Sequence, residues 1–207
     1  MQRLYLDPYE YWLTMLVITA ICLFLFYKRS VYLYTGLIIA VFFFGDLMLK
    51  ELLALKQDRI VVYNVSRHKL ADVYRGKHVI PVYKDSIPDK MTAYTLSPAR
   101  LAFRAMEIQE QYDDALFRIG NATVLFLDRC DAIKQGTTFA VDFLVVSHQC
   151  HFDPEAWYRT FHPRKIIIDG SLPRWKATLW KQQLESMGAH VHWVQEDGAW
   201  VFPATRD

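Results

Sequence analysis

Residues 141–169 read VDFLVVSHQCHFDPEAWYRTFHPRKIIID, in which two apolar runs enclose a segment with the features of a helix. The runs VDFLVVS (141–147) and KIIID (165–169) are short and rich in β-branched residues, as is typical of strands buried on both faces of a sheet. Between them, an Asp-Pro pair opens residues 153–161 and suits the cap and the first position of a helix. The order strand, helix, strand predicts two parallel strands joined by a helical crossover.

The alternation continues towards the C-terminus. Residues 173–187, PRWKATLWKQQLESM, have the pattern of a helix that ends before Gly188. HVHWV (190–194) and AWVF (199–202) predict a last pair of strands around a turn at Asp197-Gly198. These elements together predict an α/β domain with a mixed sheet flanked by helices.

The region before residue 141 gives weaker signals of the same kind. RIVVYNV (59–65) and KHVIPVY (77–83) are rich in Val, Ile and Tyr and predict strands, and NATVLFLD (121–128) predicts another buried strand. The polar residues 84–97 predict a loop. Apolar residues at helical spacing after a proline predict a helix over 98–112.

The first quarter of the chain differs from the rest in composition. The hydrophobic content of 53% is high for a soluble domain, and the excess lies there. Residues 11–27 carry no charge and residues 31–49 carry one, Asp46, while a membrane-spanning helix needs about 20 apolar residues. We therefore expect two transmembrane helices, over 11–27 and 31–49, within a membrane hairpin formed by residues 1–57, and a separate α/β domain over 58–207. A buried helical hairpin in a soluble core is the alternative, but such helices usually have a polar face.

The membrane orientation follows from basic residues near the ends of the spans. Lys28 and Arg29, in the tight connection between the two runs, favour a cytoplasmic tip. Lys50, Lys56 and Arg59 follow the second run and favour the opposite orientation, so the residues alone leave both open.

Overall charge and cysteine content exclude little. The formal net charge is +2, from 24 basic and 22 acidic residues, which by itself predicts neither an acidic nor a basic partner. Cys22, Cys130 and Cys150 are too few and too irregularly spaced for a disulfide framework or a zinc ribbon, so we expect free thiols.

A cluster of metal-ligating residue types follows the predicted strand 141–147. His148, Cys150, His151 and Asp153 lie within six positions, at the carboxyl end of a parallel strand, where open α/β sheets place their sites. A divalent metal needs three or four converging ligands, more than this stretch can supply. Neighbouring strand ends offer Asp128, Cys130, Asp169, His162 and His68. Because Asp153 is also explained as a helix cap, we favour a polar loop over a metal site.

Basic and aromatic residues alternate in residues 159–181. Arg164, Lys165, Arg174 and Lys176 are the basic residues that we predict to contact nucleic acid, because single-strand binding surfaces combine cations with aromatic side chains. The aromatic residues nearby are Trp157, Trp175 and Trp180. The alternative, which the helical spacing favours, is a solvated helix face with the tryptophans packed on the sheet.

Several of these stretches carry a resemblance to a known family. VLFLD (124–128) resembles a strand that ends in a metal-binding aspartate, and DFLVVSHQCH (142–151) resembles the family's Asp-x-Leu-Lys-Val-x-His-His-Gly-Ser stretch. HPRKIIIDGS (162–171) and GAHVHWVQEDGAWVF (188–202) resemble the strand and the closing turn that come next in the family. The chain thus resembles the C-terminal metallo-β-lactamase-like domain of the ComEC family, the membrane channel proteins of DNA uptake in natural competence.

The chain departs from the family at the positions that bind metal. Asp128 and His148 fall on two ligand positions, but Gln149 replaces the second histidine, and no His-x-His-x-Asp-His motif occurs. A dinuclear centre needs ligands from several loops, so the resemblance implies a partial or degenerate domain that is non-catalytic and has no cofactor. The first alternative is a hydrolase or nuclease that acts on DNA with Zn or Mn, held by Asp128, His148 and His151. The second is a membrane-tethered protein-interaction module.

The resemblance also implies a location and partners. We expect a multi-pass protein of the cell membrane whose soluble domain is extracytoplasmic, with membrane lipid and DNA as partners. A whole ComEC protein has many more spans than two, so we expect this chain to be a fragment or a split subunit, with a separate or upstream ComEC-type channel region as a further partner.

Overall fold

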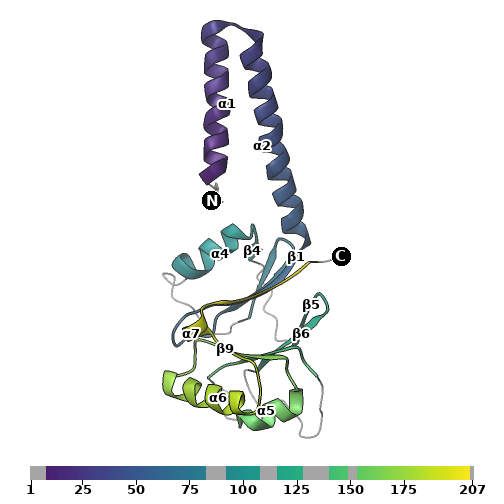
Figure 1. Ribbon diagram of the computed structural model, residues 1–207, viewed down its shortest axis with the longest axis vertical. Helices are drawn as coiled ribbons and strands as arrows, with labels where there is room; N and C mark the ends of the chain where they lie inside the picture. Colours follow the sequence, from purple (N-terminus) through teal and green to yellow (C-terminus); the bar gives the residue numbers. More distant parts are fainter. Residues whose placement is uncertain (1–7, 83–91, 108–115, 128–139, 149–152, 206–207) are drawn as a thin grey trace.

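The computed structural model describes residues 8–82, 92–107, 116–127, 140–148 and 153–205 of the 207-residue chain. Figure 1 shows a helical hairpin that projects from an α/β body. Two sheets and six α-helices make up the described part, so the fold is mixed α/β.

The hairpin consists of α1 (Pro8–Tyr27) and α2 (Ser30–Lys56). The chain reverses at Lys28, which has a left-handed conformation (φ 50°). Midway along the hairpin the helices pack closely, because Gly36 is buried and a Cβ added there would lie 3.1 Å from the Ala20 Cβ. Small residues at a helix crossing allow this approach. Both predicted apolar runs are therefore helical and lie side by side.

One described helix, over Tyr9–Tyr27, is long and apolar enough to cross a membrane. The second predicted span, 31–49, lies within the longer α2, whose second half also carries Asp46, Lys50 and Glu51. The helix α2 then passes into the first strand of the body without a linker, since α2 ends at Lys56 and the strand begins at Gln57.

The first sheet contains, in spatial order, β10, β1, β2, β3 and β4. Their bounds are Trp200–Thr205, Gln57–Val62, Ala71–Arg75, His78–Pro81 and Met106–Glu107. All pairs are antiparallel except β3 with β4. The last strand of the chain thus pairs with the first strand of the body and closes the sheet at one edge.

The second sheet contains β5, β6, β7, β8 and β9 in spatial order. Their bounds are Leu116–Ile119, Ala122–Leu127, Phe143–Val146, Lys165–Ile168 and Val191–Trp193. The pair β5–β6 is antiparallel, and the pairs from β6 to β9 are parallel. For β7, β8 and β9 this is the pairing that the alternation of strands and helices predicts. The helix α5 (Pro154–Phe161) connects β7 to β8, and α6 (Arg174–Ser186) connects β8 to β9.

Three apolar cores hold the layers together. The core between the two sheets contains Ile60 and Val73 from the first and Val145 and Ile167 from the second. On the outer face of the second sheet, alternate residues such as Ile166 pack against α5 and α6. The π-helical turn η1 (Thr92–Leu96) and α4 (Ser97–Ala102) cover the outer face of the first sheet. In Figure 1, α4 lies on the hairpin side of the body, with α5 and α6 on the far side.

A buried ion pair fastens α4 to the first sheet. Asp72 on β2 is fully buried, and Arg100 on α4 donates to both of its carboxylate oxygens, at 2.9 and 3.0 Å. The Tyr63 hydroxyl donates to Asp72 at 3.0 Å and lies 2.8 Å from the Tyr74 hydroxyl. Burial raises the pKa of Asp72, and the Arg100 guanidinium acts in the opposite direction.

The structure corrects four predictions of the pattern. The loop predicted over 84–97 is helical from Thr92 onward, and residues 84–91 lie outside the described residues. The helix predicted over 98–112 ends at Ala102, because Arg104 is left-handed (φ 51°) and residues 106–107 pair with β3 as a strand. The predicted pair 190–194 and 199–202 does not form, since β9 and β10 belong to different sheets. A short helix, α7 (Val194–Asp197), joins them. The predicted single mixed sheet is therefore two sheets. Three strands that the pattern missed, β2, β4 and β5, complete them.

Candidate functional site

The carboxyl ends of β7 and β8 form one edge of the second sheet, where Val146 and Ile168 lie opposite each other. Ser171 joins the two loops that leave these strand ends. Its hydroxyl accepts a hydrogen bond from the His148 backbone N–H at 2.8 Å and donates to the Asp169 carboxylate at 2.5 Å. The Ser171 N–H donates to the same Asp169 oxygen at 2.9 Å. Ser171 thus links two of the residues predicted as ligands, His148 through its backbone and Asp169 through its side chain.

The first sheet also reaches this edge. The Arg67 N–H, in the loop between β1 and β2, donates to the Gly170 carbonyl at 2.8 Å, and the Gln195 side chain donates to the same oxygen at 2.8 Å. A Cβ on Gly170 would lie 2.9 Å from the Val65 carbonyl carbon. Only glycine permits this approach of two backbones, so Gly170 fixes the edge to the first sheet.

The residues predicted as metal ligands do not all lie at the same end of the second sheet. His148 is exposed and Asp169 is buried at the carboxyl edge. His162 caps the C-terminus of α5, at the start of β8 and thus at the opposite edge. Asp153 caps α5, as predicted, and accepts from the Glu155 N–H at 3.3 Å. Asp128, Cys130, Cys150 and His151 lie outside the described residues.

Within residues 8–82, 92–107, 116–127, 140–148 and 153–205, no group of three or more His, Cys, Asp or Glu side chains is placed to hold a metal ion. The pair Asp128 and His148, and the alternative set with His151, include residues outside these ranges and remain predictions.

The structure places the four predicted nucleic-acid contacts at two separate sites. Arg174 and Lys176 lie in the first turn of α6, just beyond the carboxyl end of β8. Arg164 and Lys165 lie at the amino end of β8, where they line a pocket with His190 and Glu185. The 13-residue helix α6, about 20 Å long, spans the distance between these ends of the sheet. Arg164 also lies 3.4 Å from the Asp142 carboxylate.

The three tryptophans differ in environment. Trp157 and Trp180 are buried and meet edge to face, with ring centroids 4.8 Å apart. These two fit the packed-tryptophan alternative. Trp175 does not, because 72% of its surface is exposed.

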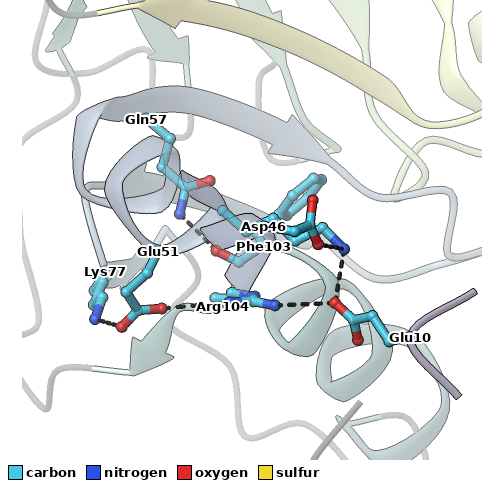
Figure 2. A network of polar contacts seen from close by, with 8 residues as sticks. Glu10, Asp46, Glu51, Gln57, Lys77, Phe103 and Arg104 are labelled. Atoms are coloured by element: carbon cyan, nitrogen blue, oxygen red, sulfur yellow. Dashed lines mark hydrogen bonds and ion pairs between the residues drawn. The ribbon is translucent and has the colours of Figure 1, made fainter. Parts of the chain in front are cut away.

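A second polar cluster, which the sequence pattern did not predict, lies where the hairpin meets the body (Figure 2). Glu10 on α1 is almost fully buried, with an exposed fraction of 1%. The Lys50 ammonium donates to Glu10 at 2.7 Å and lies 3.4 Å from Asp46. The Arg104 guanidinium lies 3.6 Å from the same Glu10 oxygen. The i, i+4 spacing of Asp46 and Lys50 was the one local signal of this cluster.

The cluster continues into the body through α2. Glu51 pairs with Lys77, in the turn between β2 and β3, and lies 3.5 Å from Arg104. The hydrogen bond from Lys77, together with the charges of Lys77 and Arg104, holds the pKa of Glu51 below its usual value. Gln57 donates to the Phe103 and Gly76 carbonyls at 2.6 and 2.8 Å.

Three acidic and three basic side chains therefore neutralise one another at the junction. Such a cluster fixes the hairpin to the body and leaves little net charge for a ligand.

The α/β body matches a known family over almost its whole length. Residues 60–204 match the family model described as the ComEC C-terminal domain. No curated protein and no solved structure matches the chain. The matched range runs from β1 to β10 and so includes both sheets.

Proposed function

The chain belongs to the ComEC C-terminal domain family, and on that premise we propose that it is a membrane-anchored, non-catalytic domain of a competence-type DNA-uptake protein. The observation that carries the proposal is the family match over residues 60–204. The α/β body is, in this proposal, a degenerate metallo-β-lactamase-like domain. The strand-end positions of His148 and Asp169 at one edge support that assignment.

The surface of the hairpin supports a membrane anchor with two spans. Apolar side chains are exposed along both helices, as expected for contact with lipid. Aromatic residues gather at both ends of the hairpin, where amphipathic rings favour the membrane–water interface. They are Tyr9, Tyr11 and Trp12 at the body end and Tyr27 and Tyr34 at the tip.

The tip of the hairpin supports the orientation. Lys28 and Arg29 lie at the end of the hairpin that is remote from the body (Figure 1). Cytoplasmic connections carry an excess of Lys and Arg, so a cytoplasmic tip leaves the body on the extracytoplasmic side.

Membrane anchoring can be tested by alkaline carbonate extraction. The full chain should stay in the membrane pellet, because exposed apolar side chains surround α1 and α2. Replacing Leu16 and Val41, both exposed near the middle of their helices, by lysine should move the chain to the supernatant, since each lysine costs about 2.5–3.5 kcal/mol at a helix centre. Release of the unaltered chain would contradict the two-span anchor.

The non-catalytic part of the proposal rests on the ligand positions. Among the described residues, His148 occupies a ligand position of the family, and its backbone N–H donates to Ser171. A dinuclear centre that activates water requires histidines and carboxylates from several loops. Under the alternative, Zn or Mn held by Asp128, His148 and His151 would support DNA hydrolysis, and cleavage of DNA on addition of either metal would favour it.

DNA binding should be electrostatic and should come chiefly from the first turn of α6. Arg164 already faces Asp142, and Glu185 lines the same pocket, so the cations at the amino edge are partly neutralised. Replacing Arg174 and Lys176 by glutamine should flatten the slope of log affinity against log salt for single-stranded DNA by about 1.4, at about 0.7 for each phosphate contact.

The matched control is the replacement of Arg164 and Lys165 by glutamine, which should change the slope by less than half as much. Anisotropy titrations of a labelled oligonucleotide, with the full chain in detergent, measure both slopes. If the unaltered chain binds no DNA even at low salt, the membrane-tethered protein-interaction module becomes the better account.

A further inference from the structure

Trp175 stands out on the surface of the body. It lies in the first turn of α6 with 72% of its surface exposed, although Trp157 and Trp180 in the same layer are buried. Leu179, one helical turn further along, is 55% exposed and lies on the same face. Trp175 and Leu179 together form a small exposed apolar patch, which is common on protein surfaces and gains significance here from the charges around it.

The residues around Trp175 indicate a negatively charged partner. Arg174 is exposed beside it. The Lys176 ammonium lies 4.6 Å from the centre of the Trp180 ring, which holds this charge at the helix surface. Residues 174–181, RWKATLWK, include no acidic residue. An exposed aromatic ring between two cations is the combination that surfaces for single-stranded nucleic acid use.

The position of α6 argues against the bilayer as the partner. Figure 1 shows α6 on the side of the body far from the hairpin, with both sheets between them. A membrane crossed by the hairpin would therefore not reach Trp175.

The helix also gives Trp175 a rigid support. Ala177, Trp180 and Leu184 on the opposite face are buried against the second sheet. A ring on a rigid helix loses little conformational freedom when a base stacks on it.

We propose that Trp175 is a stacking platform for a base of single-stranded DNA, with Arg174 and Lys176 in contact with the flanking phosphates. This inference rests on the proposed role in DNA uptake and adds to it the residue that receives a base.

The test compares three variants of the full chain in detergent, titrated into labelled oligo-dT and into a duplex of the same length. Trp175→Ala should weaken binding to oligo-dT by about 5- to 150-fold, the range for losing one stacked base, and should barely change binding to the duplex. Trp175→Phe should retain most of the affinity. Leu179→Ala, the matched control on the same face, should lose less than twofold.

Two readouts separate stacking from charge. Trp175→Ala should leave the salt slope unchanged, because no phosphate contact is removed, and oligo-dT should quench less tryptophan fluorescence in Trp175→Phe than in the unaltered chain. Circular dichroism of each variant checks that the body is folded, which we expect because both side chains are exposed.

The possible failures are distinguishable. If the unaltered chain binds oligo-dT with a clear salt slope and Trp175→Ala binds equally well, the platform is wrong while the DNA role stands. If Leu179→Ala weakens binding as much as Trp175→Ala, the face is an apolar docking surface and the platform is again wrong. If no DNA binds at low salt, the proposed function fails as well.

Discussion

Replacing Arg100 by methionine should lower the free energy of unfolding of the α/β body by about 3–5 kcal/mol. The Asp72 carboxylate is fully buried, and Arg100 supplies the cation and two of its hydrogen bonds, at 2.9 and 3.0 Å. Methionine would leave that charge with the Tyr63 hydroxyl and without a cation. A buried charge without compensation is among the most costly defects that one substitution can cause.

The matched control is Arg159→Met. Arg159 is 76% exposed and pairs with Glu155 at 2.5 Å on the surface of α5, so its loss should cost less than about 1 kcal/mol. Urea unfolding of the full chain in detergent, followed by tryptophan fluorescence, measures both. Equal losses for the two arginines would contradict the role given to the buried pair.

The Arg100→Met variant also carries a pH signature. Without the guanidinium, the folded-state pKa of Asp72 should rise further above the unfolded value of about 3.9. A carboxyl whose folded pKa is raised costs stability as pH rises above the unfolded pKa, and costs nothing when it is protonated in both states. The deficit relative to the unaltered chain should therefore be smaller near about pH 4 than near about pH 7.

The Arg100–Asp72 pair also shows a contact that the helix predicted over 98–112 could not reveal. Residues 98–112 keep an apolar helical spacing, and that spacing gives no sign that Arg100 faces inward. Asp72 lies 28 positions from Arg100, so the local sequence does not predict their contact. The chain leaves the helix at Phe103, turns at Arg104 and adds an edge strand instead. The pairing of residues 106–107 with β3 has thus overridden the local helical pattern.

The sequence pattern correctly predicted the features that depend on neighbouring residues. The apolar strands, the Asp153 cap and the ending of α6 before Gly188, which has φ 82°, all lie where the pattern predicts. These features depend on residues within a few positions of each other. The parallel pairing of β7 with β8 and of β8 with β9 follows from them, because a helix between two strands returns the chain to the same end of the sheet.

Pairing between distant segments could not be predicted in the same way. Asp197-Gly198 has the composition of a hairpin turn, yet the chain there crosses from one sheet to the other. The strand β10 pairs with β1, about 140 positions earlier, and no local residue specifies that partner. The four predicted basic residues are separated because β8 lies between the two pairs and carries the chain from one end of the sheet to the other.

The junction between hairpin and body illustrates a further limit. Glu10 precedes the first apolar run by one position and has the sequence context of a solvated charge, but it is buried between Lys50 and Arg104. Its partners come from a second helix and from the body, 40 and more positions away. Hydropathy predicted the two apolar helices of the hairpin but gave no sign of the polar contacts that fix them to the α/β body.

Gly170→Ala should destabilise the body by about 2–4 kcal/mol, because its Cβ would meet a backbone that cannot yield. The Cβ would lie 2.9 Å from the Val65 carbonyl carbon, 3.2 Å from the Val65 nitrogen, and nearer still to the carbonyl oxygen. Relief requires the 169–171 loop to move off the first sheet. That movement would break the hydrogen bond from the Arg67 N–H to the Gly170 carbonyl.

The control for this substitution is Gly198→Ala. Gly198 has φ 89°, and a Cβ there meets no atom within 4 Å, so it tests backbone conformation without a clash and should cost about 1–2 kcal/mol. Urea unfolding of the full chain measures both costs, and amide hydrogen exchange reports the local change. Compared with the unaltered chain, the Arg67 amide should exchange faster in Gly170→Ala and at the same rate in Gly198→Ala. Only the first variant displaces its acceptor, the Gly170 carbonyl. Equal exchange in both would mean that the carboxyl edge of the second sheet, with His148 and Ser171, does not depend on the close approach at Gly170.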